Sequence, residues 1–300
     1  MMVFQHLRLD EASAEFFTLW IDMQDRRLNV LEEGFFHELD QIGNLLVEAG
    51  NQKPVVVRSA KPKGFVVGAD LRRILQIHTD SDIQAFLHCG QEALNRWELL
   101  PFPTIAWIEG TALGGGLELA LACRYRVATP KPETVLGMPE TKLGLTPGWG
   151  GTQRLIPLVG WELGLQMLML GEPIDCEKAL ACGLVDQLWP TELNRDTWNS
   201  HGRSLIAQSR SIVRLHERML TQTDQERIQM WKAAAGRADE VDSHLKLPAR
   251  EVIWKDIMTG AYGDLEAGLK AERTNFFELL KRDEVQVALR RFDKPKSPSS

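Results

Sequence analysis

Hydrophobic and polar positions along the first hundred residues predict strands and helices in alternation. Apolar residues recur at helical spacing in 31–50 and 83–100, and Pro101 ends the second of these segments. Short apolar runs predict buried strands at 16–23, 53–60 and 104–110. Strands alternating with helices are typical of βαβ units, so we expect an α/β fold.

After about residue 190 the pattern changes, because charged and apolar residues interleave almost continuously. This pattern predicts a helical region over 191–292, which follows a core over 1–190. The last residues, 293–300, are rich in Pro, Ser and Lys, and we expect a disordered tail there. The total of 300 residues is enough for one large domain or two small ones.

Composition excludes several classes of protein. With 44% hydrophobic and 25% charged residues, the chain is neither disordered nor fibrous, and a net charge of −6 predicts no nucleic-acid or membrane partner. Four cysteines without CxxC spacing and seven histidines without a ligand pattern predict no disulfide framework and no metal site. Without a signal peptide or a long apolar segment, we expect a cytoplasmic location.

A glycine cluster follows the strand that ends at Gly110. Gly114–Gly116 lead into 117–126, which we expect to be a helix. Glycines at a strand-to-helix turn leave backbone N–H groups uncovered, and the helix N-terminus adds partial positive charge, so this turn could hold an anion or a developing oxyanion. The dinucleotide pattern G-x-G-x-x-G fails because Leu119 occupies the third glycine position. A tight turn with close packing is the alternative.

Two glutamates lie near such turns. Glu118 falls in the first turn of the expected helix, where it could equally serve as a helix-start carboxylate. Glu140 follows in GMPETKLGL, where a solvated loop carboxylate is the alternative. Paired carboxylates beside an oxyanion site can perform acid–base chemistry on a carbonyl compound, although sequence spacing does not show that they meet.

The middle of the chain resembles the crotonase (enoyl-CoA hydratase/isomerase) superfamily. Four motifs of that family occur in the expected order, at 68–70, 110–120, 137–144 and 147–155, and the resemblance spans about 16–189. Two other segments, 26–40 and 258–289, resemble the hydratase part of multifunctional fatty-acid oxidation α-subunits and its linker to a 3-hydroxyacyl-CoA dehydrogenase part.

The resemblance implies a crotonase (ClpP-like) α/β fold, a spiral of ββα units with a helical C-terminal region. It also implies an enoyl-CoA hydratase in fatty-acid β-oxidation, acting on an acyl-CoA without metal or redox cofactor. The residues that match the family's catalytic motifs are Glu118 and Glu140, with the backbone N–H groups of Ala69 and Gly115 as the oxyanion hole. A Δ3-Δ2-enoyl-CoA isomerase and a non-catalytic acyl-CoA-binding subunit are the alternatives.

Substrate contacts follow from the same resemblance. The segment 67–72 would lie along CoA, and Trp149, where the family usually has a small residue, could narrow the acyl pocket. The substrate-binding candidates are Val67, Gly68, Asp70, Leu71, Arg72, Gly114 and Trp149. The cations available to the CoA phosphates are Lys61, Lys63, Arg72 and Arg73, each of which could instead belong to a solvated basic face.

Assembly is predicted from the family as well. We expect a homotrimer or hexamer and a possible 3-hydroxyacyl-CoA dehydrogenase partner. The apolar residues of 258–289 are expected to pack at least partly on the core of their own chain, near the acyl end of the site; they are Leu265, Leu269, Phe276, Phe277, Leu279 and Leu280.

Overall fold

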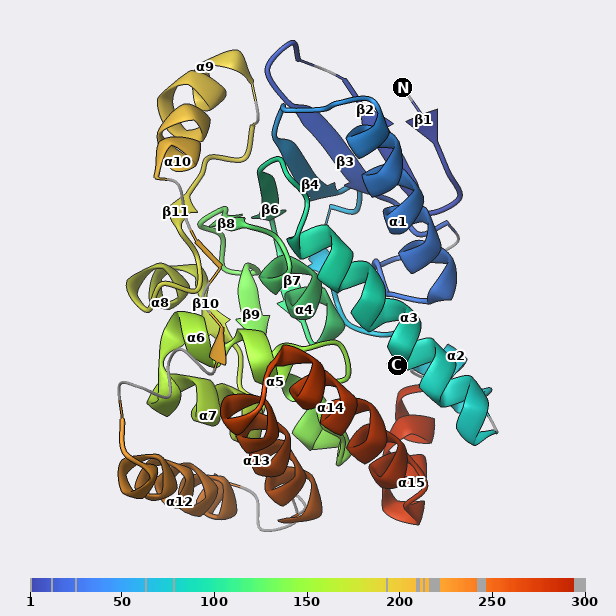
Figure 1. Ribbon diagram of the computed structural model, residues 1–300, viewed down its shortest axis with the longest axis vertical. Coiled ribbons are helices and arrows are strands. Elements are labelled where there is room, and N and C mark those ends of the chain that lie inside the picture. The colour runs from blue at the N-terminus through green and yellow to red at the C-terminus, as the bar shows by residue number, and fades with distance from the viewer. Residues whose placement is uncertain are drawn as a thin grey trace, which may run out of the picture.

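The chain folds into two β-sheets surrounded by helices (Figure 1). The computed structural model describes residues 2–11, 13–24, 26–62, 64–77, 79–192, 194–208, 211–212, 214–215, 222–241 and 247–293. The strands are β1 (Met2–Val3), β2 (Leu7–Asp10), β3 (Phe17–Ile21), β4 (Val55–Ser59), β5 (Gly64–Val66), β6 (Thr104–Ile108), β7 (Thr111–Leu113), β8 (Tyr125–Ala128), β9 (Val135–Gly137), β10 (Ile174–Asp175) and β11 (Gln187–Leu188).

The helices cover these sheets and form the whole C-terminal third of the described chain. They are α1 (Glu33–Glu48), α2 (Leu71–Leu75), α3 (Asp80–Glu98), α4 (Gly115–Leu121), the 3₁₀-helix η1 (Pro139–Leu143), α5 (Gly151–Arg154), α6 (Ile156–Val159), α7 (Trp161–Leu170), α8 (Cys176–Ala181), α9 (Arg195–Thr197), the π-helix η2 (Trp198–Gly202), α10 (Arg203–Ala207), α12 (Asp224–Val241), α13 (Leu247–Tyr262), α14 (Leu265–Leu280) and α15 (Asp283–Asp293).

The larger sheet has the order β1-β2-β3-β4-β6-β8-β11, and its strands from β3 to β11 run parallel. Continuous apolar runs suit these strands because both faces of the sheet are covered. In β4 the alternation of the strand places Val55 and Val57 in the main core and Val56 in a second core on the opposite face. Trp198 and Leu205, from η2 and α10, cover that second face.

The smaller sheet, β10-β9-β7-β5, positions the site. Its strands β5, β7 and β9 are parallel neighbours, with Val66 beside Ala112 and Ala112 beside Leu136. The carboxyl ends of parallel strands lie at the same edge of a sheet. The turns that follow β5, β7 and β9 therefore meet at one place.

The predicted strands at 16–23, 53–60 and 104–110 and the predicted helices at 31–50 and 83–100 are all present, with ends shifted by a few residues. The helix expected over 117–126 is wrong in its second half. Helix α4 ends at Leu121, and Tyr125 begins β8, whose four residues are buried between β6 and β11. Tertiary pairing outweighs local helix preference there.

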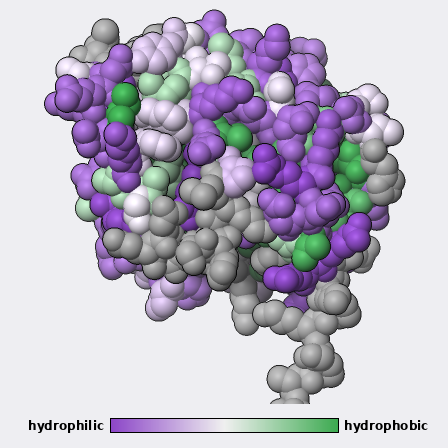
Figure 2. Space-filling view, turned by 90° about the horizontal axis from the view of Figure 1, so that it is seen from below, coloured by the Kyte–Doolittle hydropathy of each residue, from purple (hydrophilic) through white to green (hydrophobic). Residues whose placement is uncertain are grey.

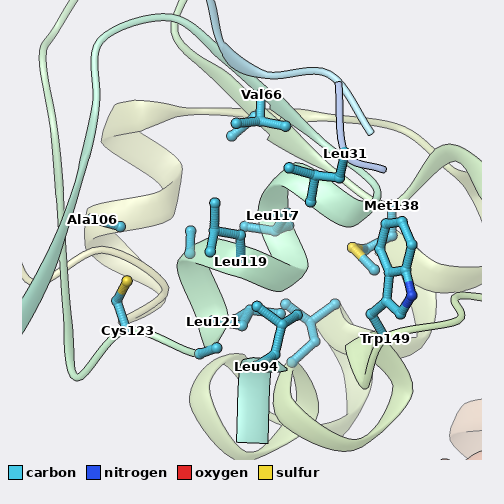
Figure 3. Close-up of a cluster of buried hydrophobic side chains, with 14 of the residues drawn as sticks. Leu31, Val66, Leu94, Ala106, Leu117, Leu119, Leu121, Cys123, Met138 and Trp149 are labelled. Atoms are coloured by element: carbon cyan, nitrogen blue, oxygen red, sulfur yellow. The ribbon is translucent and has the colours of Figure 1, made fainter. Parts of the chain in front are cut away.

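Helix α4 lies inside the core. Figure 3 shows Leu117, Leu119 and Leu121 of this helix, with Val66 and Leu31 on one side and Leu94 on the other. All seven residues of α4 are buried, including Glu118. A helix that is apolar all round must be enclosed, and its single carboxylate is correspondingly remote from water.

The C-terminal helices pack on the rest of the chain. Helix α14 contacts α3, α5 and α13, and Figure 1 shows α13 and α14 beside α5. The main core includes residues from Leu7 to Leu289, with Phe276, Leu279 and Leu280 of α14 among them, and Leu269 is also fully buried. The expectation that this segment folds back on its own core is confirmed. The predicted tail begins at the last residue of α15, and 294–300 lie outside the described residues.

The surface carries only scattered apolar side chains. On the face shown in Figure 2, the coloured residues are mostly hydrophilic, and the hydrophobic ones form small separate groups. No helix in the described ranges is both long and apolar enough to cross a membrane.

Candidate active site

Three turns at the carboxyl edge of the smaller sheet build the site. Gly68 and Ala69 follow β5, Gly114 follows β7, and η1 with Glu140 follows β9. Helix α4 begins directly after Gly114 and carries Glu118 in its first turn. The order of parallel strands thus brings together all four motifs that the sequence analysis identified.

The backbone nitrogen of Ala69 lies close to Gly115. A Cβ built on Gly115 would lie 3.5 Å from the Ala69 nitrogen. Ala69 forms an isolated β-bridge with Leu31. In this bridge the Leu31 N–H donates to the Gly68 carbonyl and the Asp70 N–H donates to the Leu31 carbonyl, at 2.9 Å each. Gly115 is the first residue of α4, whose initial N–H groups have no acceptor within the helix. The pair can receive one oxygen atom.

Two glycines make this close packing possible. A Cβ on Gly116 would lie 2.0 Å from the Val66 carbonyl oxygen, so α4 approaches β5 more closely than any side chain allows. Gly114 has a φ of 51°, and a Cβ there would lie 2.6 Å from Glu140 Oε1. Glycine at 114 therefore leaves the space that the Glu140 carboxyl occupies.

Glu118 is almost fully buried, with 2% of its surface exposed. Its Oε1 accepts hydrogen bonds from the N–H groups of Trp149 and Gly151, both at 2.8 Å. Burial raises the pKa of Glu118 to about 7, against the lowering by these two N–H groups and by the charge of Arg154. Glu118 does satisfy a helix start, but that of α5 rather than its own.

Glu140 lies in η1 and is partly buried. Its Oε2 is inaccessible to water and has no hydrogen-bond partner in the described part of the chain. Burial, and then the charge of Glu118, raise the pKa of Glu140 to about 8. The interpretation of Glu140 as a solvated loop carboxylate is therefore wrong. Near neutral pH this carboxyl keeps its proton more readily than Glu118 does.

A cavity of about 630 Å³ joins these groups. Every site residue named from the sequence lines it: Val67, Gly68, Ala69, Asp70, Leu71, Arg72, Gly114, Gly115, Glu118, Glu140 and Trp149. Sequence reasoning missed much of the apolar wall, including Phe86 and Leu143, whereas Phe276 lines the cavity as expected for a residue near the acyl end of the site. Phe276 belongs to α14, so the C-terminal region contributes to the cavity.

Trp149 fills the space between α3 and the Gly115 turn. Its ring centroid lies 4.8 Å from that of Phe36 and 5.4 Å from that of Phe86. A Cβ on Gly90 would lie 2.3 Å from Trp149 Nε1, so α3 accommodates the indole only because residue 90 is glycine. The indole lines the cavity, and that it narrows the acyl pocket stays a prediction.

The cationic side chains near the cavity differ from those that were expected to be available to the CoA phosphates. Lys61 pairs with Asp22 at 2.5 Å and Arg73 with Glu33 at 2.7 Å, and neither lines the cavity; Lys63 lies outside the described residues. Local charge composition did not reveal these ion pairs.

The cations that do line the cavity come from three separate segments. They are Arg26, Arg72 and Lys142, and Arg26 also pairs with Asp70 at 2.5 Å. Sequence reasoning missed Arg26 and Lys142. No group of three or more His, Cys, Asp or Glu side chains is placed to hold a metal ion within the described ranges.

A family model described as enoyl-CoA hydratase/isomerase matches residues 18–251. The chain belongs to this family, as the four motifs predicted.

Among curated relatives, the chain is 34% identical over 281 residues to the fatty acid oxidation complex subunit alpha of Vibrio campbellii, and that alignment covers 94% of this chain and 40% of the relative. It is 36% identical over 260 residues to the subunit of that name from Idiomarina loihiensis, with 86% and 37% covered. The chain therefore spans about two-fifths of the length of these relatives.

Solved structures show the same fold. An enoyl-CoA hydratase from Bacillus anthracis is 26% identical, with a TM-score of 0.61 and 96% of each chain covered. A carnitinyl-CoA dehydratase from Mycobacterium thermoresistibile is 20% identical, with a TM-score of 0.74 and coverage of 97% of this chain and 91% of the other. The crotonase fold expected from the sequence is confirmed.

Proposed function

We propose that the protein is an enoyl-CoA hydratase, which adds water to a trans-2-enoyl-CoA to give a 3-hydroxyacyl-CoA in fatty-acid oxidation. The observation that carries this proposal is the pair of glutamates on one cavity, Glu118 and Glu140, beside the Ala69 and Gly115 N–H groups. Family membership and the names of the relatives support the same activity.

The N–H pair is suited to the charge that forms during hydration. When water adds to C3 of the enoyl group, negative charge develops on the thioester oxygen, and Ala69 and Gly115 donate to that oxygen. Removal of one such donor typically costs about 2.7–4 kcal/mol of transition-state stabilisation. Because both donors are backbone groups held by strand and helix ends, they require no rearrangement during the reaction.

The two glutamates divide the proton transfers. Glu118, whose Oε1 is held by two N–H groups, is the better carboxylate and takes a proton from water as the oxygen bonds to C3. Glu140, with the higher pKa and an oxygen without a donor, stays protonated and delivers its proton to C2. Protons balance, because one carboxyl gains what the other loses.

Binding of CoA follows the lining of the cavity. We assign the phosphates to Arg26, Arg72 and Lys142 and the acyl group to the wall formed by Phe86, Trp149 and other apolar residues. The reaction forms a C3–O and a C2–H bond from the C2=C3 double bond and water without an external oxidant or reductant, and we propose that it needs no metal or redox cofactor.

We also propose that the product passes to a 3-hydroxyacyl-CoA dehydrogenase, either a separate partner or a further part of a longer chain. Trimeric or hexameric assembly and a cytoplasmic location stay predictions.

Hydration can be measured directly through the loss of absorbance of crotonyl-CoA and of a long-chain enoyl-CoA in parallel. We expect turnover of at least one of them, and the ratio reports the acyl length that Trp149 permits. An assay with a 3-enoyl-CoA tests the isomerase alternative. Absence of turnover with all substrates by a folded protein would overturn the proposal and leave the binding-subunit alternative.

A further inference from the structure

A third buried carboxylate, Glu272, faces the loop that holds Glu118. Four consecutive backbone N–H groups, from Trp149 to Thr152, are divided between two carboxylates in alternation. Trp149 and Gly151 donate to Glu118 at 2.8 Å each. Gly150 donates to Glu272 Oε2 at 2.7 Å and Thr152 donates to Oε1 at 3.0 Å. The loop is therefore held from both sides.

The alternation depends on the sequence of the loop. Gly150 has a φ of 102°, and a Cβ there would lie 1.9 Å from Arg154 Nη1. Gly151 is equally crowded, since its Cβ would lie 2.2 Å from the Met138 side chain. Because neither residue has a side chain to anchor it, their N–H groups are the donors by which the loop can be held.

Burial of the Glu272 carboxylate at this position is energetically unfavourable. It is 0% exposed, and burial raises its pKa well above the ordinary value, to which the charges of Glu118 and Asp256 contribute further. Its two oxygens are both used as acceptors, since the Thr152 hydroxyl also donates to Oε1. In place of Glu272, glutamine would present an NH₂ group to one of these donors.

We propose that Glu272 is a positioning residue for Glu118. By holding Gly150 and Thr152, it orients the intervening N–H group of Gly151, and with it that of Trp149, onto Glu118 Oε1. This leaves the other Glu118 oxygen to act on water. The inference rests on the proposed hydratase function for its catalytic consequence, whereas the holding of the loop is independent of that function.

The test compares Glu272→Gln with a matched control, Asp256→Asn. Asp256 is equally buried and belongs to the same helical layer, but its carboxylate accepts from Thr146 and Asn275 rather than from the loop. Both variants lose one buried carboxylate. Only Glu272→Gln should alter the position of the loop.

In the hydratase assay, we expect Glu272→Gln to lower kcat about 10- to 100-fold with KM changed less than twofold, because remote misplacement of a catalytic group costs rate rather than binding. The acidic limb of its pH–rate profile should move to higher pH, since Glu118 is then held less well by the two N–H groups that lower its pKa. Asp256→Asn should keep kcat within about twofold, with an unchanged acidic limb.

A second measurement does not need turnover. Hydrogen exchange of the peptide that contains 149–152, followed by mass spectrometry on the full chain, should be faster in Glu272→Gln than in the wild type and in Asp256→Asn. Should Glu272→Gln not fold, Thr152→Val removes the hydroxyl bond and should give a smaller change in the same direction.

The outcomes separate the two proposals. Unchanged exchange together with kcat within twofold of the wild type would overturn the role of Glu272. Equal acceleration of exchange in both variants would also overturn it, because the effect would then be general destabilisation. A wild-type protein without hydratase activity would overturn the proposed function, and the exchange result would still decide whether Glu272 holds the loop.

Discussion

Two groups of buried carboxylates in this molecule have opposite surroundings. Glu98, at the end of α3, is 7% exposed and lies 3.3 Å from Arg154 and 2.7 Å from Arg214. Burial raises its pKa, but the charges of the two guanidinium groups and their hydrogen bonds together lower it below the ordinary value. Glu98 is a permanently ionised group whose role is structural.

Glu118 is buried to a similar degree and Glu140 is partly buried, and neither forms an ion pair with a cation in the part of the chain that the structure describes. Their pKa values rise to about 7 and about 8, so a proton can be gained or lost near neutral pH. The comparison teaches that burial alone does not make a carboxylate suitable for proton transfer. A buried carboxylate becomes suitable for proton transfer when no cation is directly paired with it, because the ionised form is then not favoured over the neutral one.

The two groups of carboxylates should differ most in how their substitution affects kcat. Glu118→Gln keeps the size of the side chain but removes the proton acceptor, so kcat should fall by a factor of order 10²–10⁴ with little change in KM. Glu140→Gln should behave alike, whereas Glu98→Gln should keep the kcat of the folded enzyme. Near-wild-type hydration by either active-site variant would contradict the two-glutamate mechanism.

The free energy of unfolding should respond in the opposite way, with the larger loss on substitution of Glu98. Glu98→Gln leaves Arg154 without its paired charge in the interior, and loss of one partner of a buried ion pair typically costs about 3–5 kcal/mol of the free energy of unfolding. Urea unfolding of Glu98→Gln and Glu118→Gln should show the larger loss in the former. An equal or smaller loss in Glu98→Gln would remove the distinction between the groups.

The pH dependence of kcat/KM should be bell-shaped, with limbs that belong to the glutamate pair. Below about pH 7 the base Glu118 becomes protonated, and above about pH 8 the acid Glu140 loses its proton, so activity falls on both sides. Rates of crotonyl-CoA hydration between pH 5.5 and 9.5 test this. A profile that is flat across this interval would show that neither carboxyl titrates as described.

A smaller effect is expected in the pH dependence of stability. Burial raises the pKa of Asp256 to about 7 from its ordinary 3.8. Between these values the folded chain keeps a proton that the unfolded chain releases, so stability falls as pH rises towards 7. Asp256→Asn should flatten the change in Tm between pH 5 and 7 by a few degrees. An identical slope in the variant and the wild type would contradict the raised pKa.

Much of the site could be predicted because its parts are local patterns. The glycine turns, Glu118 and Glu140 lie on short motifs, and parallel strands bring these motifs together. The continuous run of valines in β4 likewise predicts a strand buried on both faces. The helix expected to reach Arg126 was too long, because pairing of β8 with β6 and β11 is not encoded in its local sequence.

Other parts depend on contacts between distant segments. Arg26 lines the cavity and pairs with Asp70, which is 44 residues away in the sequence, and Lys61 forms an ion pair with Asp22. No spacing rule reveals that Glu272 meets Thr152, 120 residues away. The sequence therefore predicts the groups of the reaction better than those that hold them in position.

The 149–152 loop is held by both Glu118 and Glu272, so the order of synthesis during translation determines when the loop has both carboxylates. Glu118 is synthesised before Trp149 and Thr152, but Glu272 is synthesised 120 residues after Thr152. At about 5–20 residues per second, the loop waits roughly 6–24 s for its second carboxylate. A nascent chain can thus form both sheets and still lack an ordered reaction centre, and its competence depends on a helix that emerges after the sheets are complete.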